Sequence, residues 1–147
     1  MYTYLLILHV LGASVWTGGH LVLVIGFLPR ALRNQDPALI TGFESRFERV
    51  GIPALISQVV TGLWLAYIRV PDVSQWLTFN TYQSTLISLK LVLLLVTLGL
   101  AAHARVRIIP RLDANRMREL AFHMITVTVL AVLFVVLGVG YRTGGVL

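Results

Sequence analysis

Four long runs of uncharged, mostly apolar residues dominate this 147-residue chain and leave little choice of fold. They lie at residues 1–29, 50–68, 91–104 with the uncharged stretch before Lys90, and 120–141. Each run supplies the roughly 20 apolar residues that cross a bilayer core. A backbone in lipid must satisfy its own hydrogen bonds, and the runs do not alternate as barrel strands do. We therefore predict an all-α, integral membrane four-helix bundle.

We expect one transmembrane domain over residues 1–147. Its helices should lie near 2–31, 44–68, 84–108 and 117–141, with a turn at 33–37 and a longer loop at 69–82. Pro53 would then lie near the start of the second helix, where its missing donor costs little. The first run is too long for the hydrophobic part of a signal peptide and has no basic leader, so we interpret it as a helix.

The arginines predict the orientation of the bundle. Nine lie around the first and third loops and two lie elsewhere, at Arg69 and Arg142. The nine are Arg30, Arg33, Arg46, Arg49, Arg105, Arg107, Arg111, Arg116 and Arg118. Because positive residues stay in the cytoplasm, both termini should lie on the outer side of a bacterial inner membrane. The net charge of +6 therefore reflects topology and does not indicate nucleic-acid binding.

Four histidines lie within or at the ends of these runs: His9, His20, His103 and His123. An ionisable group in a membrane is costly and marks a candidate functional site. The chain has no cysteine and three methionines, which excludes thiolate metal sites and CxxCH haem attachment. Imidazole is thus the available ligand for a haem or a metal ion, and hydrogen bonding between helices is the structural alternative.

The first helix carries two of these histidines on one face. His9 and His20 are eleven residues apart, which corresponds to about 16.5 Å along a helix axis. Gly12 and Trp16 lie on the same stripe, and we expect Gly12 to make room for a flat ring. On the second helix, Gln58 belongs to a polar stripe that either joins helices together or lines a cofactor pocket.

Depth in the membrane suggests two candidate sites. His9 and Lys90 both belong to the outer third, where Lys90 either snorkels to the interface or holds a porphyrin propionate. His20, His103 and His123 belong to the inner half at similar depth. Lys90 and His103 are thirteen residues apart and so lie on different faces of their helix. We therefore rank His20 and His123 above His103 as a ligand pair.

The sequence resembles the copper-resistance D (CopD-like) family of small membrane proteins and the related HemJ-type protoporphyrinogen oxidases, over roughly residues 5–110. The similar segments read LLILHVLGASVWTGGHLVLVIGFLPRAL, FESRFERVGIPALISQVVTGLWL and LISLKLVLLLVTLGLAAHARV. The HemJ resemblance implies a tetrapyrrole site at His9 and Lys90. The fourth helix departs from it, since MRELAFHMITVTVLAVLFVV lacks the expected Asn-Glu and proline motif. The CopD-like resemblance implies copper transport.

These observations predict a haem b-binding membrane protein that transfers electrons, with one or two haems held by imidazole ligands. The first alternative is copper transport through histidine ligands, which has few soft sulfur ligands available here. The second is a tetrapyrrole oxidase that passes electrons to quinone, and the third is a structural subunit of a larger complex. A quinone or redox protein would be the partner. Short four-helix bundles often form homodimers, although this sequence shows no strong GxxxG seam.

Overall fold

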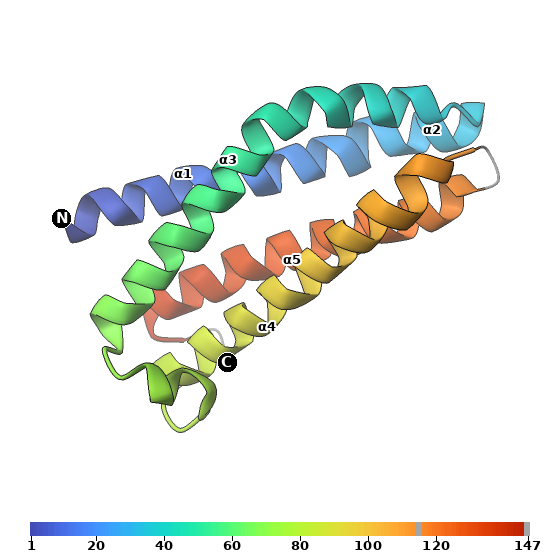
Figure 1. The fold of residues 1–147 in the computed structure, drawn as a ribbon. Coiled ribbons are helices and arrows are strands. Elements are labelled where there is room, and N and C mark those ends of the chain that lie inside the picture. The colour runs from blue at the N-terminus through green and yellow to red at the C-terminus, as the bar shows by residue number, and fades with distance from the viewer. Residues whose placement is uncertain (114–115, 146–147) are drawn as a thin grey trace.

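The computed structural model describes residues 1–113 and 116–145 as a bundle of four long helical rods (Figure 1). The rods are Tyr2–Asn34, Pro37–Arg69, Tyr82–Arg111 and Met117–Thr143. They contain 27 to 33 residues, which is enough to cross a bilayer at 1.5 Å per residue. No strand occurs in the described residues. The predicted all-α membrane bundle is confirmed, and the chain is a multi-pass membrane protein.

Prolines shape the C-terminal ends of the first and third rods. The first rod consists of α1 (Tyr2–Leu21), the π-helical η1 (Val22–Phe27) and α2 (Leu28–Asn34). The third consists of α4 (Tyr82–His103), the π-helical η3 (Ala104–Ile108) and the 3₁₀ turn η4 (Ile109–Arg111). Each π-helical segment comes just before a proline, Pro29 or Pro110. A proline ring clashes with the preceding turn and donates no hydrogen bond, and a locally wider helix relieves both problems.

The second rod, α3, begins at Pro37 and not near residue 44. Gln35 adopts a left-handed conformation with φ of 48°, and the Asp36 carboxylate accepts a hydrogen bond of 2.9 Å from the Ala38 amide. This cap and the proline at the first helical position start the helix early. Pro53 therefore lies inside α3, and our prediction that it lies near the helix start is wrong. Helix α3 bends along its length in Figure 1, as an interior proline predicts.

The loop between α3 and α4 is held by its own short 3₁₀ helix, η2 (Val73–Leu77). The Trp76 side chain is buried, and its Nε1 donates to the Val70 carbonyl at 2.8 Å. The Ser88 hydroxyl donates in turn to the Trp76 carbonyl. These bonds fix the loop over the start of α4.

The main buried apolar cluster lies at one end of the bundle. Helix α1 packs on α3 and on α5 (Met117–Thr143), and α4 packs on α5, whereas α3 hardly contacts α4. The buried core lies where α2, the start of α3 and the start of α5 meet. Its members are Leu23, Leu28, Ala31, Ile40, Ile108, Met117, Leu120, Ala121 and Met124.

The opposite end of the bundle holds both termini and the η2 loop (Figure 1). There α3 swings away from the N-terminal part of α1, toward the η2 loop and the start of α4. Large apolar side chains such as Leu95, Ile25 and Phe122 are more than 60% exposed around the outside. Lipid is the environment that accepts such a surface.

Candidate functional site

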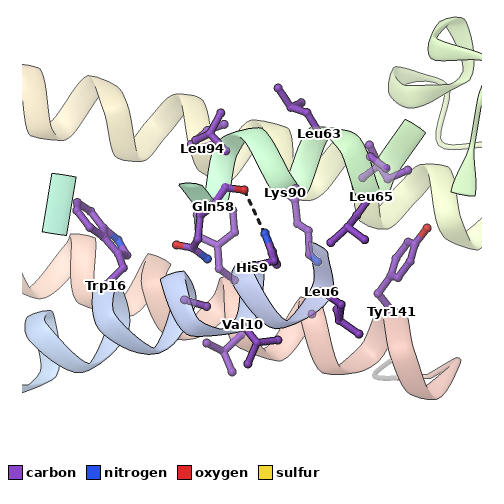
Figure 2. Close-up of a pocket in the computed structure, with 18 of the residues that line it drawn as sticks. Leu6, His9, Val10, Trp16, Gln58, Leu63, Leu65, Lys90, Leu94 and Tyr141 are labelled. Carbon is purple, nitrogen blue, oxygen red and sulfur yellow. Dashed lines mark hydrogen bonds between the residues drawn. The ribbon is translucent and has the colours of Figure 1, made fainter. Parts of the chain in front are cut away.

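A cavity of about 780 Å³ lies between α1, α3, α4 and α5, toward the end that holds the termini. Its walls are mainly apolar, and a few polar side chains point into it (Figure 2). The volume is in the range of small-molecule and cofactor sites. The polar and aromatic residues among its lining are Tyr2, His9, Ser14, Trp16, Thr17, Gln58, Arg69, Trp76, Lys90, Thr97, Phe134, Tyr141, Arg142 and Thr143.

His9 is the imidazole of this cavity, and its neighbours set its protonation. Its Nδ1 lies 3.1 Å from the Gln58 carbonyl and 3.1 Å from the Thr61 hydroxyl. A carbonyl only accepts, so the hydrogen-bond network assigns the ring proton to Nδ1. Nε2 therefore carries the lone pair, which is the arrangement that a metal-ligating histidine has when its other nitrogen donates to a carbonyl.

Small and hydroxyl-bearing residues of α3 hold this ring in place. A Cβ atom added to Gly62 would lie 3.0 Å from His9 Cε1, so the glycine leaves room for the imidazole. The Thr61 hydroxyl donates to the Ser57 carbonyl at 2.6 Å and is therefore free to accept from His9. The sequence did not identify Thr61 as a partner of His9, because only the register of α1 against α3 brings the two side chains together.

Lys90 enters the same cavity from α4 (Figure 2). It is the only lysine in the chain. Its Nζ lies 5.5 Å from the centre of the Tyr141 ring, and within the described residues it makes no hydrogen bond or ion pair. The Tyr141 hydroxyl is also buried without a partner there. No aspartate or glutamate is among the described residues that line the cavity. A half-buried cation and an unsatisfied hydroxyl therefore share a space that contains no acid.

Gly12 and Gln58 lie where α1 touches α3. A Cβ on Gly12 would lie 2.8 Å from Gln58 Cγ and 3.0 Å from the Ala54 carbonyl oxygen. Gly12 therefore allows two helix backbones to approach each other, and it is not among the residues that line the cavity. The group that it accommodates is α3, in contrast to the flat ring that we expected from the sequence. Gln58 contributes to the cavity wall and supplies the carbonyl that binds His9.

His20 lies apart from His9 and outside the cavity lining. Its Nδ1 donates to the Trp16 carbonyl at 2.8 Å, and its ring packs 4.4 Å from Trp16 and 5.8 Å from Phe47. Its backbone carbonyl lies opposite the Thr128 hydroxyl, at 3.5 Å. That register places His20 about 7.5 Å along the axis from the level of His123.

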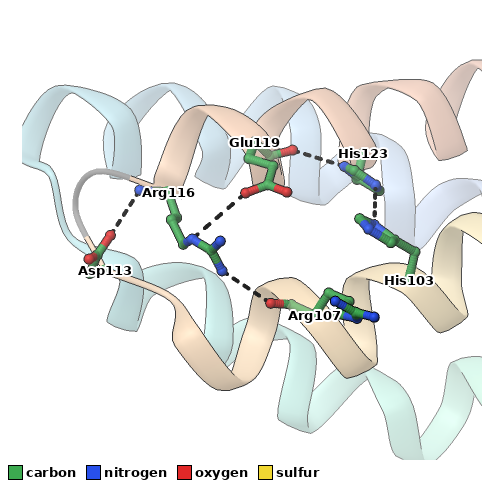
Figure 3. Close-up of polar contacts among 6 residues, drawn as sticks. All are labelled: His103, Arg107, Asp113, Arg116, Glu119 and His123. Atoms are coloured by element: carbon green, nitrogen blue, oxygen red, sulfur yellow. Dashed lines mark hydrogen bonds and ion pairs between the residues drawn. The ribbon is translucent and has the colours of Figure 1, made fainter.

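His123 lies beside His103 (Figure 3). His103 Nδ1 and His123 Nε2 are 3.0 Å apart, and the rings stack with an interplanar angle of 15°. His123 Nδ1 donates to the Glu119 carbonyl at 3.0 Å, so its Nε2 accepts the proton of His103. The pair lies on the surface of the bundle, with His103 exposed. The structure thus joins His123 to His103 in place of the expected His20.

The reason for this exchange is the true length of the first rod. We expected the first helix to end near residue 31, whereas the rod continues to Asn34 and contains a π-helical segment. His20 therefore lies farther from the core end of the bundle than the sequence predicts, and it is not at the level of His123. The thirteen-residue spacing does keep His103 on a different face from Lys90, and that face meets α5 at the surface. In the described ranges, no three His, Cys, Asp or Glu side chains lie close enough to hold a metal ion together.

Residues 41–141 match the family model described as Copper resistance protein D. The chain belongs to this family. The CopD-like resemblance read from the sequence is confirmed, and the family is one whose name relates it to copper. No curated protein and no solved structure matches the chain. The matched segment of this copper resistance protein D family member contains Gln58, Lys90 and the His103–His123 pair, whereas His9 precedes it.

Proposed function

We propose that this copper resistance protein D family member binds haem b in its cavity and takes part in electron transfer within a bacterial inner membrane. The observation that carries the proposal is the chemistry of the cavity. A space of about 780 Å³ combines an imidazole whose Nε2 has no hydrogen-bond partner in the described residues with a lysine that has no acidic neighbour in the described lining. A single copper ion is far smaller than this space, and an ammonium group repels it.

The residues present fit a haem. His9 Nε2 would bind the iron, because the Gln58 carbonyl and the Thr61 hydroxyl fix the ring from its other side. Lys90 would pair with a propionate, and the apolar wall would contact the porphyrin faces. Bound haem supplies one-electron redox chemistry. The chain itself would contribute His9 as an iron ligand, Lys90 as the counter-charge and an apolar wall that would tune the redox potential.

Two further parts of the proposal concern the setting. The nine-to-two distribution of arginines supports an orientation in which the core end would lie in the cytoplasm and the cavity, with both termini, would lie on the outer side. The cavity would then exchange electrons with a membrane quinone or an outer redox partner. We propose one domain that binds a single haem in this cavity. The other three histidines would make structural contacts or bind copper.

The test is a visible spectrum and a haem assay of protein purified in detergent from haem-replete cells, with copper measured on the same sample. We expect about one extractable haem per chain, and none after His9→Ala. His103→Ala is the matched control, because it removes an imidazole outside the cavity. A colourless wild-type protein with stoichiometric copper would contradict the proposal.

A second candidate function is copper transport, and the His103–His123 pair favours it. Two imidazole nitrogens face each other at 3.0 Å, and replacing the shared proton would let both bind Cu⁺ as substrate. Copper binding that disappears in the His103→Ala/His123→Ala variant, and persists in His9→Ala, would support this function. Equal copper retention in all three variants would exclude the pair.

A further inference from the structure

The cavity becomes more positive toward its outer mouth. Besides Lys90, its lining includes Arg69 at the end of α3 and Arg142 near the end of α5. The Arg69 Nη2 donates to the Tyr2 hydroxyl at 2.9 Å, and its guanidinium carbon lies 5.1 Å from the centre of that ring. Three cations thus line one cavity, and none of the described lining residues is an acid.

The three cations lie on the same side of His9 along the bundle. Gly62 touches His9, and Arg69 follows it by seven residues, or about 10.5 Å along α3. A Cβ on Gly138 would lie 3.8 Å from Lys90 Nζ, and Arg142 follows Gly138 by about 6 Å along α5. The positive charge therefore begins beside the imidazole and continues outward to the mouth.

We propose that the cavity selects a ligand that carries two carboxylates on one edge, with that edge turned toward the mouth. Lys90 binds the inner carboxylate, and Arg69 and Arg142 bind the outer one. Arginine forks suit a planar carboxylate, which they hold through paired hydrogen bonds. This inference rests on the proposed haem function, and it assigns the orientation and charge of the ligand within that site.

The buried Tyr141 hydroxyl supports the same arrangement. The ring of Tyr141 lies 5.5 Å from Lys90 Nζ in the cavity lining, and its hydroxyl has no hydrogen-bond partner in the described residues. A buried hydroxyl normally has a partner, and a carboxylate at this position would accept its proton. An uncharged isoprenoid quinone offers no group that satisfies Lys90 and the two arginines together.

The experiment compares iron protoporphyrin IX with its dimethyl ester, which keeps the iron and the ring but removes both negative charges. Each is titrated into detergent-purified, haem-free protein, and binding is followed by absorbance. We expect the ester to bind about 10- to 100-fold more weakly than the diacid, since charge-assisted hydrogen bonds are lost. In the Arg69→Gln/Arg142→Gln variant this ratio should fall several-fold toward one.

Arg46→Gln/Arg49→Gln is the matched control, because those arginines lie outside the cavity lining. It should keep the wild-type ratio, and elution as a single species checks folding of every variant. Equal binding of diacid and ester by the wild-type protein overturns the two-carboxylate inference while the haem function stands. Failure of both forms to bind overturns the haem function, and this inference with it.

Discussion

Lys90→Met should change the stability of the empty protein and its affinity for haem in opposite directions. The lysine is half-buried, faces an apolar cavity and has no acidic neighbour in the described lining. Methionine keeps the length of the side chain and removes the charge. We expect the haem-free variant to gain about 1 kcal/mol or more of stability, because an uncompensated polar group leaves the cavity.

Affinity should fall in the same variant. A charge-assisted hydrogen bond is worth roughly 1.5–3 kcal/mol, which corresponds to a Kd about 10- to 150-fold higher. Haem titration of the empty protein gives the Kd, and thermal unfolding in the same detergent gives the change in stability. Leu94→Met is the matched control, since it alters the same wall without changing its charge.

Two results would refute this reasoning. An unchanged Kd in Lys90→Met would mean that the lysine snorkels to the interface and does not touch the ligand. A loss of stability in the empty variant would mean that the contact of Nζ with the Tyr141 ring outweighs the cost of burying the charge.

Three further predictions follow from local geometry. Gly62→Ala should displace the His9 ring and weaken haem binding about five-fold, the equivalent of about 1 kcal/mol, whereas Gly99→Ala, which meets nothing within 4 Å, should leave binding unchanged in the same titration. The chain has no cysteine, so single cysteines at Thr78 and Gln35 test the orientation. An impermeant thiol reagent on whole cells should label the first and not the second, and the reverse pattern would invert the topology. Hydrogen bonds from the Ser74 hydroxyl and amide hold the pKa of the exposed Asp72 carboxylate below its ordinary value of 3.8. The stability that this carboxylate contributes to η2 is present above that value and is lost as the pH falls through the lower folded pKa, so protease cleavage of residues 70–80 should accelerate only in acid.

Hydropathy and charge by themselves determined the class of fold. Insertion into lipid depends on the sum of residue properties over a local run, so four apolar runs were enough to predict four helices. The turn after Arg33 was also readable, because Asp36 and Pro37 act on the backbone beside them. The family resemblance pointed to His9 and Lys90, and the structure lines one cavity with both.

Only the tertiary structure decided which side chains meet. Pairing across helices depends on axial register, which the π-helical segment before Pro29 and the early start of α3 both shift. A shift of one or two turns joined His123 to His103 and left His20 against Trp16. The same register placed Gly62 and Thr61 against His9. The cavity forms because Gly12 lets α1 pack closely on α3, whereas α3 makes few contacts with α4. Such packing depends on two complementary helix surfaces and cannot be deduced from one segment of the sequence.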